Sequence, residues 1–352
     1  MQQPWYATRE QVKRALDSAE TARNNAQVDR AIASASRSIE QQCHRKFYPW
    51  DGTRYKGFRP WNDGNSSWRL WLGEDELVSL TTLVAGGNTI SASDYFLEPI
   101  NSGPPYTSLE MDLESNSVLQ AGVTWQRAIA ITGTFGYWDE QESVGTLADN
   151  LDADVTDTAT ITWTDPAGVG VGSILKIDSE RLIVTETSFV DSTQNLGGSG
   201  LAASAAANTV TVSDSTGFYV GELIRIEAEV MLVVDIGTAT TIIVKRAWDG
   251  SVLAAHSAAV DIYGKTGVQL SRAQLGSTLA AHTTSDVVYR YVVPPLVNDL
   301  CVAEAVSQLQ AEIGGYKNAE GASVTRPATA SLRALREAVV GEYGRKARHM
   351  AI

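Results

Sequence analysis

The feature that most constrains the fold is an internal repeat in the middle of the chain. Residues Ile161 to Val184 align without a gap on residues Val210 to Val233. A second echo matches RAWDGSVLAAH, which ends at His256, to RAQLGSTLAAH, which ends at His282. Such self-similarity predicts two copies of one structural module. The aligned pairs of the first echo include Asp165 with Asp214, Gly168 with Gly217, Gly172 with Gly221, Asp178 with Glu227 and Glu180 with Glu229.

Both copies have the pattern of β-strands. Each begins with alternating Val, Ile and Thr, turns at Asp-x-x-Gly, and continues through an alternating run such as LIRIEAEVMLVVD. Alternation of polar and apolar residues is typical of antiparallel strands with one wet face and one buried face. We therefore expect a regular strand from about Leu223 to Asp235. Its wet face would carry Glu227 and Glu229, and Asp178 and Glu180 would lie on the wet face of the first copy.

The two ends of the chain have helical patterns instead. Thr8 and Gln11 form a capping-box signal, which predicts a helix to about Ala15 or Leu16. An apolar stripe ending at Cys43 predicts a second, longer helix. After Pro294-Pro295 a third helix is expected to stop at Gly314-Gly315, and a fourth begins near Thr329 or Ser331. The stripe of the second helix comprises Val28, Ile32, Ala35, Ile39 and Cys43.

These patterns predict an α+β protein with an insertion. The expected architecture is a discontinuous helical-bundle connector core with a small β-sheet, plus an inserted all-β domain made of two repeated modules. The first part of the core spans residues 1–145, with the small sheet ending near Phe135 and a loop over residues 138–154. The inserted domain spans residues 146–292, and the second part of the core spans residues 293–352.

Composition and charge restrict the function. The chain has 352 residues and a formal net charge of −13. This balance disfavours tight wrapping around nucleic acid, which requires basic surface. No run approaches the roughly 18 apolar residues of a membrane span, and no signal peptide is expected. Cys43 and Cys301 are far apart in the sequence and are expected to be buried free thiols.

The sequence offers no catalytic motif. GxSxG, Walker A, HExxH, GxGxxG and CxxC arrangements are all missing, so we expect neither catalysis nor a cofactor. His256 and His282 lack nearby ligand partners in the sequence, and we expect hydrogen bonding near turns rather than metal binding. The carboxylates at 178, 180, 227 and 229 suggest solvated faces rather than a glycosidase pair.

Three segments together resemble a known family. IEQQCHRKFYP, ITGTFGY and VPPLVNDLCVAEAV occur in an order and spacing similar to those of head–tail adaptor proteins of tailed double-stranded-DNA bacteriophages. The resemblance implies a structural virion protein that forms a ring of about twelve copies in the neck. Its partners would be the portal and the next neck or tail protein, a stopper or tail terminator. DNA would pass through the lumen without sequence-specific binding, and assembly would occur in the host cytoplasm without a membrane.

Candidate contact residues follow from charge and aromatic content. A basic terminal helix and tail suggest portal docking, and an aromatic-rich stretch suggests subunit contacts. The alternative function is a surface glycan- or receptor-binding β-module of a virion, which would need exposed aromatic residues at matching positions of both repeats. The portal-docking candidates are Arg333, Arg336, Arg345, Lys346 and Arg348, and the subunit-interface candidates are Trp50, Trp61 and Trp68.

Overall fold

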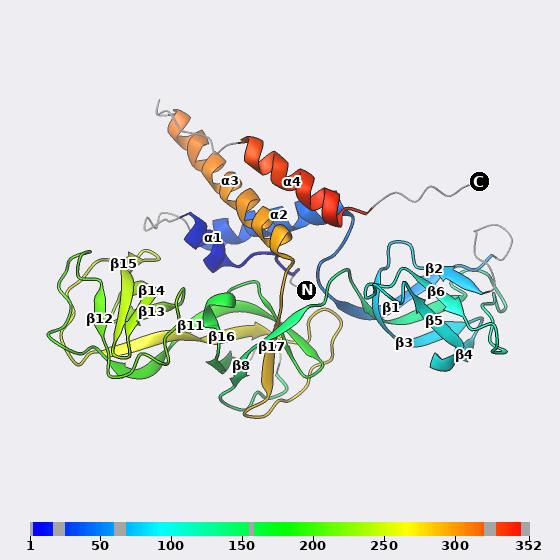
Figure 1. Cartoon of the computed structure of the whole chain (residues 1–352), viewed down its shortest axis with the longest axis horizontal. Helices are drawn as coiled ribbons and strands as arrows, with labels where there is room; N and C mark the ends of the chain where they lie inside the picture. The colour runs from blue at the N-terminus through cyan, green and yellow to red at the C-terminus, as the bar shows by residue number, and fades with distance from the viewer. Residues whose placement is uncertain (1–2, 17–24, 60–67, 155–157, 320–328, 346–352) are drawn as a thin grey trace.

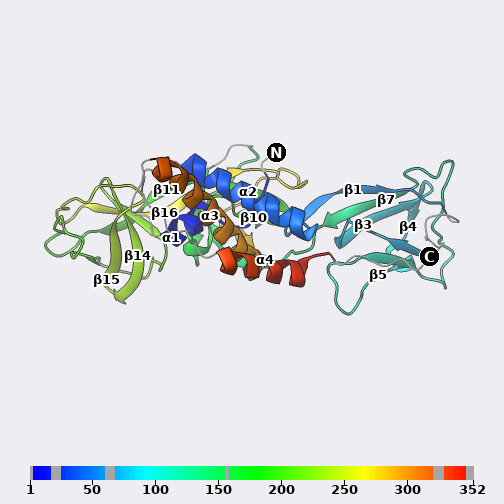
Figure 2. The same cartoon turned by 90° about the horizontal axis from the view of Figure 1, so that it is seen from above.

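The protein is mostly β-structure. A computed structural model describes residues 3–16, 25–59, 68–154, 158–319 and 329–345. Strands make up 38% of the chain and helices 21%. The predicted helical-bundle core is therefore wrong: the body is a closed six-stranded β-barrel with extra strands, and the described ranges contain only four α-helices. Three β lobes lie in a row, with the helices over the central one (Figures 1 and 2).

The helices begin close to where the sequence predicts. They are α1 (Arg9–Ala15), α2 (Asn25–Cys43), α3 (Pro295–Ala319) and α4 (Thr329–Tyr343). The capping box of α1 is confirmed, because Gln11 N donates to Thr8 Oγ1 over 3.1 Å and Thr8 N donates to Gln11 Oε1 over 2.9 Å. The predicted stop of α3 at Gly314-Gly315 is wrong, since the helix continues to Ala319.

The helices form one layer, which we call the helical layer. The buried stripe of α2 packs against α3, and both thiols lie in this core. The same core also contains Ile174, Ile183, Leu275 and Tyr291 from the β lobe beneath. The helices therefore bury their stripes partly against one another and partly against that lobe. Within the described ranges, no helix is both long and apolar enough to cross a bilayer.

The first β lobe, which we call the distal lobe, lies at one end of the molecule (Figure 1). Two small sheets enclose its core of Leu, Ile and Phe side chains. One has the order β1-β7-β3-β4 and the other β2-β6-β5. The strands are β1 (Trp50–Lys56), β2 (Arg69–Trp71), β3 (Leu77–Ala85), β4 (Asn88–Ile90), β5 (Tyr95–Glu98), β6 (Ser108–Met111) and β7 (Ile129–Phe135), the last ending where the sequence predicts.

The central lobe, barrel 1, is a closed barrel. Its order is β11-β10-β17-β8-β9-β16, and β11 pairs with β16 to close it. Residues 141–147, which we expected to be loop, form its strand β8. The strands are β8 (Gln141–Leu147), β9 (Thr158–Trp163), β10 (Ile174–Ile177), the first half of β11 (Glu180–Asn195), the second half of β16 (Asp261–Ser271) and β17 (Val287–Tyr291).

The third lobe, barrel 2, is built on the other halves of β11 and β16. It adds β12 (Thr209–Thr211), β13 (Leu223–Ile226), β14 (Glu229–Thr238) and β15 (Thr241–Trp248). Gly197 N donates to Thr211 O over 2.7 Å and brings the end of β11 beside β12. The predicted single strand from Leu223 to Asp235 is wrong, because it folds back between Ile226 and Glu229 as the β13–β14 hairpin.

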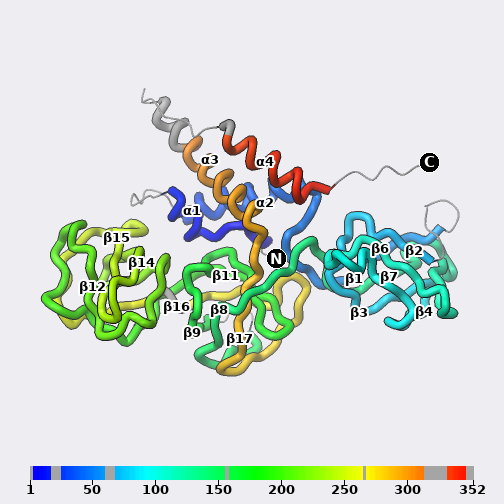
Figure 3. Tube along the Cα trace, in the orientation of Figure 1, coloured from blue at the N-terminus to red at the C-terminus, as the bar shows by residue number. Residues whose placement is uncertain are grey.

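The repeat therefore extends over the whole of both barrels. At an offset of 49 residues, four consecutive strands of barrel 1 match four consecutive strands of barrel 2. β8 matches the second half of β11, β9 matches β12, β10 matches β13, and the first half of β11 matches β14. An offset of 26 residues carries β15 onto the second half of β16 and the first half of β16 onto β17. Barrel 2 thus interrupts barrel 1 between β11 and β16 (Figure 3).

Candidate functional site

Each barrel contains a buried ionic cluster at equivalent positions. In barrel 1, Arg272 Nε and Nη2 donate to the two carboxylate oxygens of Glu180 over 2.8 Å each. His282 Nε2 lies 3.0 Å from Glu180 Oε2. The exposed fractions of the Arg272 and Glu180 side chains are both 0%. The predicted wet position of Glu180 is therefore wrong, because an arginine from the second echo, distant in sequence, covers it.

Barrel 2 repeats this arrangement with Glu229, Arg246 and His256. Arg246 Nε and Nη2 donate to Glu229 over 2.7 Å each, and His256 Nε2 lies 2.9 Å from Glu229 Oε2. Glu229 is also buried, so its predicted exposure is wrong for the same reason. The prediction that both histidines make hydrogen bonds near turns is confirmed.

The remaining bonds of the clusters hold the loops around them. Glu180 accepts from Ala273 N and Ala280 N over 2.9 and 3.1 Å, and Arg272 Nη1 donates to Asp152 O over 2.7 Å. In barrel 2, Arg246 Nη1 donates to Ala207 O over 2.9 Å. Removing one partner of such a buried pair costs about 3–5 kcal/mol, because the other charge stays buried without compensation. The clusters therefore stabilise the connections between strands.

Both buried carboxylates are held in the ionised form. Burial alone would raise the pKa of Glu229, but hydrogen bonds from Arg246, His256 and two backbone N–H groups lower that pKa to about 2. For Glu180 burial acts in the same direction, and the equivalent bonds again lower its pKa. Carboxylates fixed in this way face enclosed arginines, which suits a structural role better than proton transfer to a substrate.

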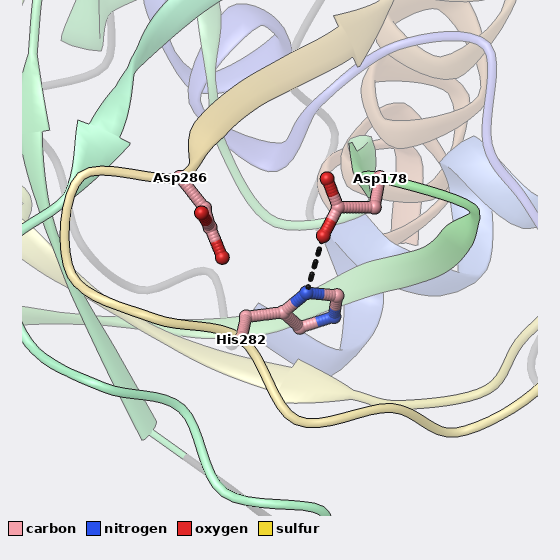
Figure 4. A group of neighbouring side chains, drawn as sticks. All are labelled: Asp178, His282 and Asp286. Atoms are coloured by element: carbon pink, nitrogen blue, oxygen red, sulfur yellow. Dashed lines mark hydrogen bonds and ion pairs between the residues drawn. The ribbon is translucent and has the colours of Figure 1, made fainter.

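A group of three potential metal ligands distinguishes barrel 1 from barrel 2. Asp178, His282 and Asp286 each offer one ligand atom, and these atoms lie within 4.8 Å of one another (Figure 4). Asp178 comes from the β10–β11 turn, whereas His282 and Asp286 come from the segment before β17. In barrel 2, Glu227 and His256 occupy the first two positions, but Val260 occupies the third. Sequence reasoning missed this group. The signal that could have found it is the 26-residue offset, which aligns Asp286 with Val260 and so shows a carboxylate present in one copy alone.

A hollow of about 210 Å³ lies between α1, barrel 1 and barrel 2. Its lining includes Arg14, Trp248 and Glu222. Glu222 is only 5% exposed, and its Oε1 accepts from Tyr219 N over 3.1 Å. Burial raises the pKa of this carboxyl to about 8, and the Tyr219 hydrogen bond opposes only part of that rise.

The predicted portal-docking residues already have partners inside the chain. Arg333 is exposed and donates to Glu337 over 2.9 Å, whereas Arg336 donates to Glu304 over 2.6 Å. Arg345 Nη2 donates to Glu74 O over 3.0 Å, which connects the end of α4 to the distal lobe. Lys346 and Arg348 lie outside the described residues. The structure therefore gathers two arginines on α4 and sets Arg345 apart at its end.

The predicted interface tryptophans lie in or beside the distal lobe. Trp50 is half-buried, and the Arg54 guanidinium lies 4.4 Å from its ring centroid. Trp68 is 38% exposed, with Arg69 4.6 Å from its ring centroid. Trp61 lies outside the described residues. Sequence reasoning missed further exposed aromatic side chains on the same lobe, among them Phe96 and Trp125.

The tryptophans of the repeats do not form a binding platform. Trp163 and Trp248 are only 6% and 3% exposed, and both belong to hydrophobic clusters. A glycan- or receptor-binding surface based on matching exposed aromatic residues in the two repeats is therefore not supported.

No family model, no curated protein and no solved structure matches this chain.

Proposed function

We propose that this chain is a structural virion protein, a head–tail adaptor that forms a ring between the portal and the tail of a tailed bacteriophage. The supporting observation is that the three segments carrying the family resemblance meet in space. Tyr137 N, just beyond β7, donates to Lys46 O over 2.9 Å, and the Tyr137 ring packs edge-on against Phe47. Cys43 from the first segment and Cys301 from the third lie in the same buried hydrophobic core.

A closed ring requires two different faces that fit one another. The distal lobe offers one of them, since most of the large exposed apolar side chains belong to it. It is also acidic, with ten Asp and Glu against five Lys and Arg between residues 50 and 137. The N-terminal segment offers the opposite charge, because residues 1–49 hold eight Lys and Arg against five Asp and Glu. Opposite charges on the two faces favour head-to-tail contact.

The remaining partners follow from the same proposal. Arg333 and Arg336 on α4 would face the portal, with Arg345, Lys346 and Arg348 beyond them. The opposite side of the ring would meet a stopper or tail terminator, and the DNA would pass through the lumen without sequence-specific contacts. About twelve copies would complete the ring. The protein would reside in the virion neck after assembly in the host cytoplasm.

The test is assembly on purified portal. We expect native mass spectrometry and negative-stain microscopy of the mixture to show one ring of this chain on each portal. The Arg333→Glu/Arg336→Gln variant should keep its circular dichroism spectrum but lose portal binding, because Arg333 is exposed and glutamine at 336 still offers a donor to Glu304. Absence of any complex at micromolar concentrations, or a virion neck without this chain, would contradict the proposal.

A further inference from the structure

The side chains beside His282 have the composition of a metal site rather than of an ion pair alone. The His282 side chain is 1% exposed, and its Nδ1 lies 3.1 Å from Asp178 Oδ2. Asp286 completes the group from the other side (Figure 4). Thr283 N donates to Asp286 Oδ2 over 2.7 Å and so orients the Asp286 side chain. Each carboxylate oxygen of Asp286 keeps a second lone pair that can bind a metal ion. A nitrogen and two carboxylate oxygens therefore converge from two loops.

The buried cluster determines which nitrogen of His282 is available. Glu180 Oε2 already accepts from Arg272 Nη2 and Ala280 N, so it acts as an acceptor toward His282 as well, and the hydrogen that they share belongs to Nε2. In the neutral imidazole, Nδ1 then presents a lone pair toward Asp178 and Asp286. A lone pair facing two carboxylates is repulsive unless a proton or a metal cation lies between them. A carboxylate that holds the far nitrogen of a ligating histidine is also the usual outer support of protein metal sites.

We propose that Asp178, His282 and Asp286 of barrel 1 bind a first-row divalent transition metal ion of the Zn²⁺ class. The imidazole nitrogen favours this class over Ca²⁺ and Mg²⁺, which prefer all-oxygen sites. Ligand bonds of about 2.0–2.2 Å around a tetrahedral ion separate the ligand atoms by roughly 3.4 Å. His282 Nδ1 and Asp178 Oδ2, which lie 3.1 Å apart, therefore need little movement. The bound ion would join the β10–β11 turn to the loop before β17 and leave one coordination position open.

Barrel 2 supplies the control within the same molecule. Its His256 is held by Glu229 in the same way, and Nδ1 lies 2.7 Å from Glu227 Oε2. Val260 replaces the third ligand, so this group offers only one nitrogen and one carboxylate. Only barrel 1 is therefore expected to bind the ion.

The experiment is a Zn²⁺ titration of the full-length, tag-free chain by isothermal calorimetry, paralleled by thermal unfolding. We expect one bound ion per chain and a rise in Tm with Zn²⁺, whereas Ca²⁺ and Mg²⁺ at the same concentration leave Tm unchanged. Asp286→Val, which copies barrel 2, should weaken the affinity by about tenfold or more. Asp178→Asn should weaken it similarly, while the equivalent change Glu227→Gln in barrel 2 should leave it unchanged.

A transplanted site gives the converse test. The Glu227→Asp/Val260→Asp variant gives barrel 2 the same three ligand types, and we expect two Zn²⁺ ions per chain. The proposal is overturned if the unmodified chain binds Zn²⁺ no more tightly than about 100 μM, or if Asp286→Val binds it equally well. It is also overturned if the transplanted site adds no second ion, or if Ca²⁺ or Mg²⁺ raises Tm as much as Zn²⁺ does.

Discussion

At the scale of single residues, the duplication shows which side chain is unusual at its position. Glu222 in barrel 2 matches Ser173 in barrel 1. Both accept a hydrogen bond from the backbone N–H three residues earlier, over 3.1 Å in each case. Serine makes this contact without charge. Glu222 brings an acid into the same buried turn, so its ionised form is destabilised by desolvation.

This comparison predicts that Glu222→Gln stabilises the protein at neutral pH. The pKa of Glu222 rises on folding to about 8. The protonated side chain therefore contributes fully to the free energy of unfolding only at pH values below the pKa of the unfolded state. That contribution is lost progressively as the pH rises toward 8. Glutamine keeps the acceptor oxygen without the charge, and we expect a gain on the order of 2–3 kcal/mol at pH 7. Urea unfolding at several pH values measures it.

The pH dependence provides the control for this variant. The difference between the two proteins should shrink toward zero at about pH 4, where the acid is neutral in both the folded and the unfolded state. Ser173→Ala tests the turn without a titrating group and should cost a similar free energy at every pH. A Glu222→Gln gain that does not change with pH would show that the carboxyl is not desolvated.

The sequence predicted the chemistry of single residues only in part. Hydrogen bonding by His256 and His282 was inferred correctly, but the carboxylates that gather beside His282 were missed because they are far from it in the sequence or follow it in a loop. The burial of Glu180 and Glu229 was missed, since alternation alone places them on a wet face. Their partners Arg272 and Arg246 come from a different echo with a different offset. Only the closed barrel brings the two echoes together.

At the scale of elements, sequence signals predicted helices correctly where the interactions that form the helix lie within the helix itself. The capping box at Thr8 and the apolar stripe ending at Cys43 define helices without help from distant residues. The turn at Glu227 was missed because it lacks glycine and proline, although the backbone there takes φ of 50°. When the residues of a turn continue the polar and apolar alternation of the flanking strands, the hydrophobic pattern does not reveal where one strand ends and the next begins.

The nested arrangement of the barrels predicts that barrel 2 can be removed alone. The strand halves that close barrel 1 pair Thr187 with Val268, immediately before the shared strands enter barrel 2. Replacing residues 188–267 by Asn-Gly leaves a two-residue hairpin, a connection that suits antiparallel strands. We expect a folded, monomeric product with a cooperative thermal transition, because the six strands and the ionic cluster of barrel 1 remain.

The larger deletion is the matched comparison. Removing residues 146–290 also removes Ile174, Ile183 and Leu275, which share a core with the helical layer. We expect that product to bind hydrophobic dyes and to unfold at a lower temperature. If the smaller deletion behaves in the same way, barrel 1 depends on barrel 2, and the two are not separable modules.

At the scale of the whole molecule, the fold class was predicted wrongly for a physical reason. The helical stripes indicated that the two chain ends pack together, and they do so through α2 and α3. That pattern does not reveal what covers the remaining apolar surface. Here Tyr291 and its neighbours in barrel 1 complete the core, so the helices form a layer on a β body rather than a bundle.

Charge is divided between these layers. Residues 1–49 and 293–352 together hold 15 Lys and Arg against 11 Asp and Glu, whereas residues 50–292 hold 13 against 30. A duplex that approaches the β body meets net repulsion, and the helical segments offer only a small excess of positive charge. Phosphate contacts govern DNA affinity and its salt dependence, so few counterions would be released on binding.

We therefore predict weak and non-specific DNA binding by the isolated chain. Fluorescence anisotropy with linear duplex at physiological salt should give a dissociation constant weaker than about 10 μM, unchanged between unrelated sequences. Replacing Arg333 and Arg336 by Glu should reduce even this binding, because it removes positive charge from α4. A ring that carries DNA past such surfaces would let the duplex slide, since no contact holds it in place. Nanomolar affinity at the same salt concentration would contradict both the charge argument and a lumen of this composition.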